Sequence, residues 1–93
     1  MNNIQFEWDD SKNRVNKLKH GVSFEEASTV FRDVFSVTGS DPDHSFGERR
    51  FVTFGNSSRN RLLVIAHTEE DNSIRIISAR LVTRQERKIY EEG

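Results

Sequence analysis

The chain has 93 residues, of which 33% are hydrophobic and 31% charged, and it carries no cysteine. This length predicts one small domain, residues 1–93, with a thin core to which seven Phe, one Trp and one Tyr contribute much of the bulk. The composition excludes a disulfide scaffold and a thiolate metal site, and no apolar run is long enough to span a membrane. Because no secretory signal peptide is recognisable either, we expect a cytoplasmic protein.

The net charge of −1 excludes a polycation that binds nucleic acid indiscriminately. The charge is unevenly distributed, since residues 1–45 hold five Lys/Arg and eight Asp/Glu, whereas residues 46–93 hold nine and seven. We therefore expect any basic surface for RNA or DNA in the second half of the chain, joined by Lys12, Lys17 and Lys19.

The chain begins with a short strand and a mostly polar helix. Residues 4–8 alternate loosely, which indicates the strand, and two aspartates then cap a helix that continues to about residue 19. Val15 and Leu18 are its expected buried side chains. Gly21 follows a basic last turn, as is typical of a helix end.

A second helix begins at the capping box Ser23-Phe-Glu-Glu26. Its apolar side chains recur at helical spacing, which predicts a stronger stripe facing the core. The members of this stripe are Phe24, Ala27, Val30 and Phe31.

Strands dominate the rest of the chain. They are expected at residues 34–38, 48–55, 61–68 and 73–80. The third of these is so apolar that it should be the central strand, covered on both faces. A second capping box, Thr83-Arg-Gln-Glu86, begins the last helix. The order βααββββα predicts an α+β domain, in which a helix pair packs on one face of a twisted, mainly antiparallel sheet.

The three histidines offer proton-transfer groups. His20 is either a cation at a helix C-terminus or a proton-transfer group beside Lys19. His44 lies in a polar loop. His67 shares strand parity with Leu63 and is either a core-edge side chain or a general acid/base facing the open sheet surface. Their spacing matches no metal-ligand motif, so we expect no metal and no cofactor.

Two of the predicted strands, residues 48–55 and 73–80, each contain two arginines. Arg49 and Arg50 point to opposite faces of a regular strand, and Arg75 and Arg80 differ in parity in the same way. A bulge or twist at the strand end is needed to bring the second pair onto one face. Their guanidinium groups suit two-pronged phosphate binding, although salt bridges to neighbouring glutamates explain each of them singly.

The last helix contributes a tyrosine to the same region. Tyr90 is either one packed aromatic on a solvated helix or a ring that stacks on a base beside a phosphate groove. RNA cleavage without metal is compatible with these residue types, since histidine, glutamate or lysine can transfer the protons and arginines can hold the phosphate. That reaction needs a base for the 2′-hydroxyl, an acid for the leaving 5′-oxygen and cations for the phosphate.

In matching order, motifs over nearly the whole chain resemble those of the BrnT family. The first half contributes Phe6-Glu-Trp-Asp9, Lys12, Asn16, Lys19-His-Gly-Val-Ser-Phe-Glu-Glu-Ala27, Val30-Phe31 and Asp33. The second half contributes Gly47-Glu-Arg-Arg-Phe51, Gly55, Arg61-Leu-Leu-Val64, His67-Thr68, Ile74-Arg-Ile-Ile-Ser-Ala-Arg80, Thr83, Glu86-Arg87 and Tyr90.

This resemblance implies a RelE-like fold and a ribonuclease toxin of a type II toxin–antitoxin system. It further implies an RNA substrate and a BrnA-like antitoxin, which carries its own DNA-binding domain, so that DNA is contacted only through the antitoxin. The expected catalytic residues are His20, His67, Arg80 and Arg49, and the expected substrate-binding residues are Lys12, Lys19, Arg75 and Tyr90.

Two alternatives remain from the sequence. A degenerate toxin that only sequesters antitoxin or nucleic acid is suggested by the low net charge and by the acidic turn Glu69-Glu70-Asp71, where the family often has an arginine. A helix-turn-helix DNA-binding subunit is less compatible with the pattern, because the second helix uses its apolar residues for packing and begins with Glu25 and Glu26.

Overall fold

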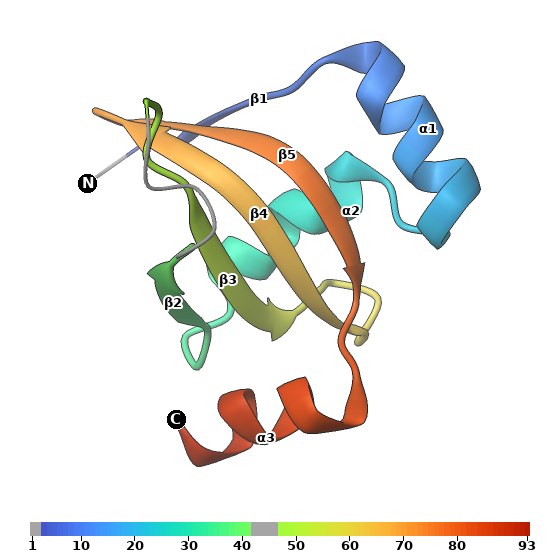
Figure 1. Ribbon diagram of the computed structural model, residues 1–93, viewed down its shortest axis with the longest axis vertical. Coiled ribbons are helices and arrows are strands. Elements are labelled where there is room, and N and C mark those ends of the chain that lie inside the picture. The colour runs from blue at the N-terminus through green and yellow to red at the C-terminus, as the bar shows by residue number, and fades with distance from the viewer. Residues whose placement is uncertain (1–2, 42–46) are drawn as a thin grey trace.

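The computed structural model describes residues 3–41 and 47–93. Its elements are β1 (Gln5–Glu7), α1 (Asp10–His20), α2 (Phe24–Thr29), the 3-10 helix η1 (Val30–Arg32), β2 (Val37–Ser40), β3 (Phe51–Asn56), β4 (Leu62–Glu70), β5 (Ser73–Leu81) and α3 (Arg84–Glu92) (Figure 1). The predicted α+β class is confirmed. His44 lies outside the described residues, and within them no helix is long and apolar enough to cross a membrane.

The five strands form one mixed sheet in the order β1-β5-β4-β3-β2. From β2 to β5 the chain is an antiparallel meander, whereas β1 pairs with β5 in parallel. The most apolar strand, β4, is therefore the central one, as its composition predicts. Since β1 covers only the first three residues of β5, the second half of β5 has no strand along its outer edge.

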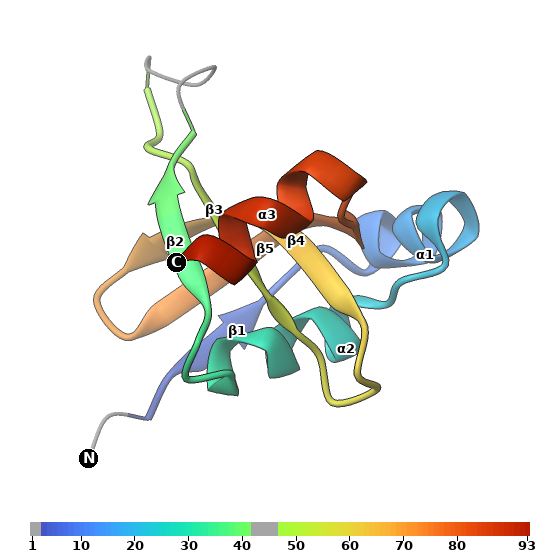
Figure 2. The same ribbon diagram turned by 90° about the horizontal axis from the view of Figure 1, so that it is seen from below.

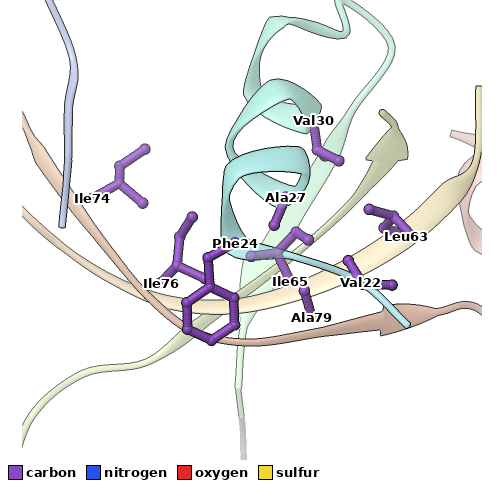
Figure 3. Close-up of a cluster of buried hydrophobic side chains, with 9 residues drawn as sticks. All are labelled: Val22, Phe24, Ala27, Val30, Leu63, Ile65, Ile74, Ile76 and Ala79. Atoms are coloured by element: carbon purple, nitrogen blue, oxygen red, sulfur yellow. The ribbon is translucent and has the colours of Figure 1, made fainter. Parts of the chain in front are cut away.

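The core lies between α2 and one side of the sheet, which we call the α2 face. Figure 3 shows the apolar side chains of α2 facing those of β4 and β5. Phe24, Ala27 and Val30 are fully buried, and Phe31 packs against them, so the predicted stripe is confirmed. The approach is close at Gly55, where a Cβ would lie 2.8 Å from Val30 Cγ1.

Helix α1 flanks the outer edge of β5 (Figure 1). The expectation that its apolar residues are buried is wrong, because Val15 is 59% exposed and Leu18 is 86% exposed. Asn16 is buried in their place. Its side-chain amide donates to Ala79 O at 2.8 Å and accepts from Ala79 N at 3.2 Å. The Asn16 side chain thus makes the hydrogen bonds to the edge of β5 that a neighbouring strand would otherwise make. The pattern of apolar residues does not predict this contact.

Helix caps set the ends of the helices largely as predicted. Asp9 accepts a hydrogen bond from Lys12 N, and Gly21 ends α1 with φ of 70°. Ser23 accepts from the backbone N–H of Glu26, but no return bond from the Glu26 carboxylate completes that capping box within the described residues. The box that begins α3 is complete.

The strand predicted at residues 34–38 begins late. Val34 and Phe35 lie in a turn and are 87% and 74% exposed, and β2 starts only at Val37. Asp33 explains the shift, because its carboxylate accepts from Phe35 N and its carbonyl accepts from Ser36 N. These bonds hold the segment as a turn.

A bulge in β5 decides which arginines share a face. Arg80 pairs with Val64 and Arg75 with Thr68, and between these positions the register shifts so that Ile77 has no partner on β4. Alternate residues of β4 point to the same side, so Arg75 and Arg80 both lie on the face opposite α2. Ser78 lies there too, and we call this side the arginine face.

Helix α3 lies across the sheet from α2, at one end of the arginine face (Figure 2). None of its residues is buried. Polar contacts attach it instead: the Arg80 guanidinium binds Glu86, and the Tyr90 hydroxyl donates to Asp33 Oδ2 at 2.7 Å. The Asn56 side chain completes the second attachment by donating to the Tyr90 oxygen.

Candidate functional site

A pocket of about 300 Å³ lies between α1 and the bulged part of β5. We call it the α1–β5 pocket. It exists because β1 ends opposite Arg75, which leaves the outer edge of β5 to be flanked by a helix. Bulges that re-aim side chains are frequent beside functional sites. The pocket is lined by Ser11, Lys12, Val15, Asn16, Lys19, His20, Ile77 and Ser78.

Three of the expected site residues meet at this pocket. Lys12, Lys19 and His20 recur at helical spacing on the side of α1 that faces β5. None of the three forms an ion pair with any of the residues that the structure describes. Lys12 does have a coulombic interaction with Asp9. Clustered basic side chains attract anions.

The arginine face continues from the pocket along β5. Ser78 lines the pocket and lies between Arg75 and Arg80 in the strand, on the same side of the sheet. Arg75 is exposed, and the side chain of Arg80 is 43% exposed. The sequence predicted that these two arginines share a face only if the strand bulges or twists, and the register shift that leaves Ile77 without a partner on β4 is such a bulge.

Arg80 is already bound to a carboxylate. Its Nη1 donates to Glu86 Oε1 at 2.8 Å and its Nη2 to Glu86 Oε2 at 2.9 Å. This two-pronged contact lowers the pKa of Glu86 to about 2. Glu86 also accepts from the backbone of Thr83 at the start of α3. An anion that binds Arg80 must therefore compete with a helix cap.

Of the two roles considered for His67, the structure shows the core side chain, and the alternative that its ring faces the open sheet surface is wrong. Its side chain is fully buried on the α2 face, with its Nε2 2.7 Å from Thr53 Oγ1 and its ring edge-on to Phe31 at 4.9 Å. Burial lowers the pKa of His67 to about 4, so the ring is neutral at physiological pH. His67 lies on the same face of β4 as Leu63, as strand parity predicted. The hydrophobic core covers that face, so substrate cannot reach the ring.

Arg49 and Tyr90 lie away from the α1–β5 pocket. The Arg49 guanidinium stacks over the ring of Phe51, which pairs with His67 on the α2 face. Tyr90 attaches the end of α3, and its hydrogen bond to Asp33 raises the pKa of the phenol. The expected single cleft thus divides: five residues lie along α1 and the arginine face, and three lie elsewhere.

The residues that form the walls and floor of the pocket were not predicted from the sequence. Val15 and Ile77 form apolar walls, Ser78 adds a hydroxyl, and Asn16 is the buried floor. A usable signal was present in the helical spacing that puts Lys12 and Asn16 on one side of α1. No signal marked Ile77, because the bulge depends on how two strands pair.

The ion pair of Arg61 with Glu26 was not predicted either. The guanidinium makes two contacts with the Glu26 carboxylate, one through Nε at 2.9 Å, and the Ser57 hydroxyl donates to the same carboxylate at 2.6 Å. These contacts attach the β3–β4 turn to α2. Among residues 3–41 and 47–93, no three His, Asp or Glu side chains gather in a way that could hold a metal ion.

Comparison with known proteins identifies a family model and a solved structure that resemble this chain. A family model described as "Ribonuclease toxin, BrnT, of type II toxin-antitoxin system" matches residues 8–86. The crystal structure of the ribonuclease toxin BrnT of Brucella abortus superposes with a TM-score of 0.64 at 16% sequence identity, over 88% of this chain and 100% of that one. At this identity the superposition shows a shared fold. A sequence search of curated proteins finds no match.

Proposed function

The chain belongs to the BrnT family of ribonuclease toxins of type II toxin–antitoxin systems, and on that premise we propose that it is a metal-independent endoribonuclease. The proposal includes a RelE-like mode of action in the cytoplasm, where cleavage of RNA arrests translation and growth. A cognate BrnA-like antitoxin would neutralise it and would supply the only contact with DNA. Membership of the family itself implies an antitoxin partner and an RNA target.

The observation that carries this proposal is the gathering of Lys12, Lys19 and His20 at one pocket. Two lysines that form no ion pair among the described residues suit the phosphates that flank a cleavage point, and a half-exposed imidazole beside them suits proton transfer. Arg75 and Arg80 extend the same basic surface along β5. Of the candidates from the sequence, these five are therefore the ones we assign to substrate.

The proposed reaction uses the ribose of the substrate as the nucleophile. A base, His20 in our assignment, removes the proton of the 2′-hydroxyl as its oxygen bonds to the adjacent phosphorus. The bond from phosphorus to the 5′-oxygen breaks, and an acid returns a proton to that oxygen. The products are a 2′,3′-cyclic phosphate and a free 5′-hydroxyl. Lys12 and Lys19 stabilise the charge that builds on the phosphate oxygens.

Arg80 would enter this reaction only after its contact with Glu86 loosens. A phosphate offers a guanidinium the same two-pronged geometry as a carboxylate, so the exchange preserves the hydrogen bonds of Arg80. The three remaining candidates would act structurally. His67 would pack the core, Arg49 would cover Phe51, and Tyr90 would hold α3.

The test is cleavage of a single-stranded RNA by the purified wild type and by His20→Gln. We expect the wild type to cleave without metal and to leave cyclic phosphate ends. The variant should cleave at least about 10²-fold more slowly, as is typical of a lost general base. Chelator in every reaction removes adventitious metal. Equal rates for the two proteins would refute the role of His20, and no cleavage by the wild type would refute the enzyme.

Two observations favour a second candidate, a binding module that sequesters antitoxin or nucleic acid without cutting it. The Arg80–Glu86 contact and the acidic turn at residues 69–71 both lower the positive potential of the arginine face. Expression without the antitoxin separates the candidates. The enzyme arrests growth and degrades RNA, whereas the module leaves both intact.

A further inference from the structure

The α1–β5 pocket has apolar walls behind its basic rim. Val15 is an exposed apolar side chain of α1, and Ile77 is half-buried where the bulge releases it from pairing with β4. These two side chains belong to different elements and line the same pocket. A site for phosphate alone needs no such walls, since phosphate is bound by cations and N–H groups.

We propose that this pocket holds one unpaired nucleobase of the RNA, between Val15 and Ile77, while the phosphate attached to that nucleotide lies on Lys12 and Lys19. The inference rests on the proposed function and adds to it a specificity site. Concave sites that combine apolar walls with a few convergent polar groups are the usual form of small-ligand sites. Proteins that read single-stranded RNA commonly place an unstacked base in such a site.

The floor of the pocket is rigid. Asn16 is buried, and its side chain makes three hydrogen bonds, two to the backbone of Ala79 and one to the carbonyl of Val22 at 2.8 Å. The pocket is therefore formed before any ligand enters, which lowers the entropy cost of binding.

Ser78 gives the pocket a means to distinguish bases. Ser78 lines the pocket, and its hydroxyl makes no hydrogen bond to another residue in the part of the chain that the structure describes. A hydroxyl can donate to a base acceptor or accept from an exocyclic amine. His20, at the end of α1, adds a planar ring beside it. Ser78 is therefore a specificity-determining residue in this account.

The experiment is a titration of the full chain with ribose 5-phosphate and with each of the four nucleoside 5′-monophosphates. Ribose 5-phosphate carries the anion and the sugar but lacks the base. We expect at least one nucleotide to bind about tenfold more tightly than ribose 5-phosphate. Val15→Ser and Ile77→Ala should each remove most of this advantage and leave ribose 5-phosphate binding unchanged.

Two further variants sharpen the titration. Leu18→Ser is the matched control, because Leu18 is an apolar residue of the same helix, is 86% exposed and lies outside the pocket, so nucleotide binding should be unchanged. Ser78→Ala should keep nucleotide binding but reduce the differences among the four bases. Val15 lies on the protein surface, so its variant is expected to fold even if the Ile77 variant does not.

The result that overturns the base site is equal affinity for ribose 5-phosphate and all four nucleotides, or nucleotide binding that Val15→Ser leaves intact. Either result identifies a simple anion site. The proposed function fails differently: nucleotides then bind with the expected preference, but RNA is not cut. Cleavage of RNA together with equal affinities would instead remove only the base site.

Discussion

Two arginine–glutamate pairs hold this protein together on opposite sides of its sheet. The Arg61–Glu26 pair joins the β3–β4 turn to α2, and its carboxylate is 4% exposed. The Arg80–Glu86 pair joins β5 to α3, and its carboxylate is 24% exposed. In both pairs an arginine makes a two-pronged contact with a glutamate, so the residue types alone do not distinguish them. The comparison shows that burial, which residue types alone do not reveal, distinguishes these two pairs.

The histidines repeat the contrast. His67 is fully buried on the α2 face, where a hydroxyl and aromatic rings surround it. His20 lies at the end of α1 beside two lysines, in a pocket open to solvent. A single residue type therefore serves packing on one side of the protein and is available for chemistry on the other.

Removal of the buried carboxylate should have the largest effect on stability. Glu26→Ala leaves Arg61 and the Ser57 hydroxyl without their partner, and we expect a loss of about 3–5 kcal/mol in the free energy of unfolding. Glu86→Ala should cost about 1–2 kcal/mol, mostly through the lost cap of α3. Urea denaturation of both variants measures the difference. Equal losses would show that the two pairs do not differ in kind.

The buried histidine should make stability depend on pH. In the unfolded chain His67 binds a proton below about pH 6.5, whereas in the folded protein its pKa is about 4. The unfolded state therefore binds more protons between these values, and stability should fall by up to about 3 kcal/mol as the pH drops from 6.5 to 4. Denaturation midpoints at several pH values measure this slope.

The control is His67→Asn, which retains a polar group to bond with Thr53. Its stability should be nearly flat between pH 6.5 and 5, a range above the ordinary pKa of every carboxylate. A slope as steep as that of the wild type would assign the proton to another group.

A third variant tests how closely η1 packs on the sheet. A methyl group at Gly55 would lie 2.8 Å from Val30 Cγ1 and 3.1 Å from Ser36 Cβ. We expect Gly55→Ala to cost about 1–3 kcal/mol in unfolding free energy, the usual range for overpacking. Gly39→Ala, in the open space of β2, serves as the control and should change little. A neutral Gly55→Ala would mean that η1 shifts freely.

The smallest expected effect concerns RNA affinity. Glu86→Gln keeps an oxygen for the cap of α3 but weakens the hold on Arg80, so RNA should bind about threefold more tightly at low salt. Glu91→Gln is the matched control, because it makes the same change of charge at an exposed site on the same helix. Equal gains in the two variants would attribute the effect to net charge alone.

Much of the fold was predictable because its signals are local. The caps at Asp9, Ser23 and Thr83, the stripe of α2 and the apolar centre of β4 depend on residues within a few positions of one another. The errors have a common origin in long-range pairing. Val15 was expected to be buried, but the Asn16 amide orients α1 through Ala79, which is 63 residues away.

The site was predictable to a lesser extent. Lys12, Lys19 and His20 meet because they share one side of a helix, which spacing reveals. Arg75 and Arg80 share a face only through the bulge at Ile77, and no local pattern marks where a ladder shifts. The burial of His67 depends on side chains distant in sequence that pack around it, so it could not be predicted from local pattern.

The most direct test of the account compares two lysines of α1 in the RNA cleavage assay. Lys19 lines the α1–β5 pocket, whereas Lys17, which is also exposed on the same helix, does not. We expect Lys19→Ala to cleave RNA at least about tenfold more slowly than the wild type, because a lost phosphate contact raises the barrier. Lys17→Ala should cleave at the wild-type rate. Equal rates for the two variants would contradict the placement of the substrate at this pocket.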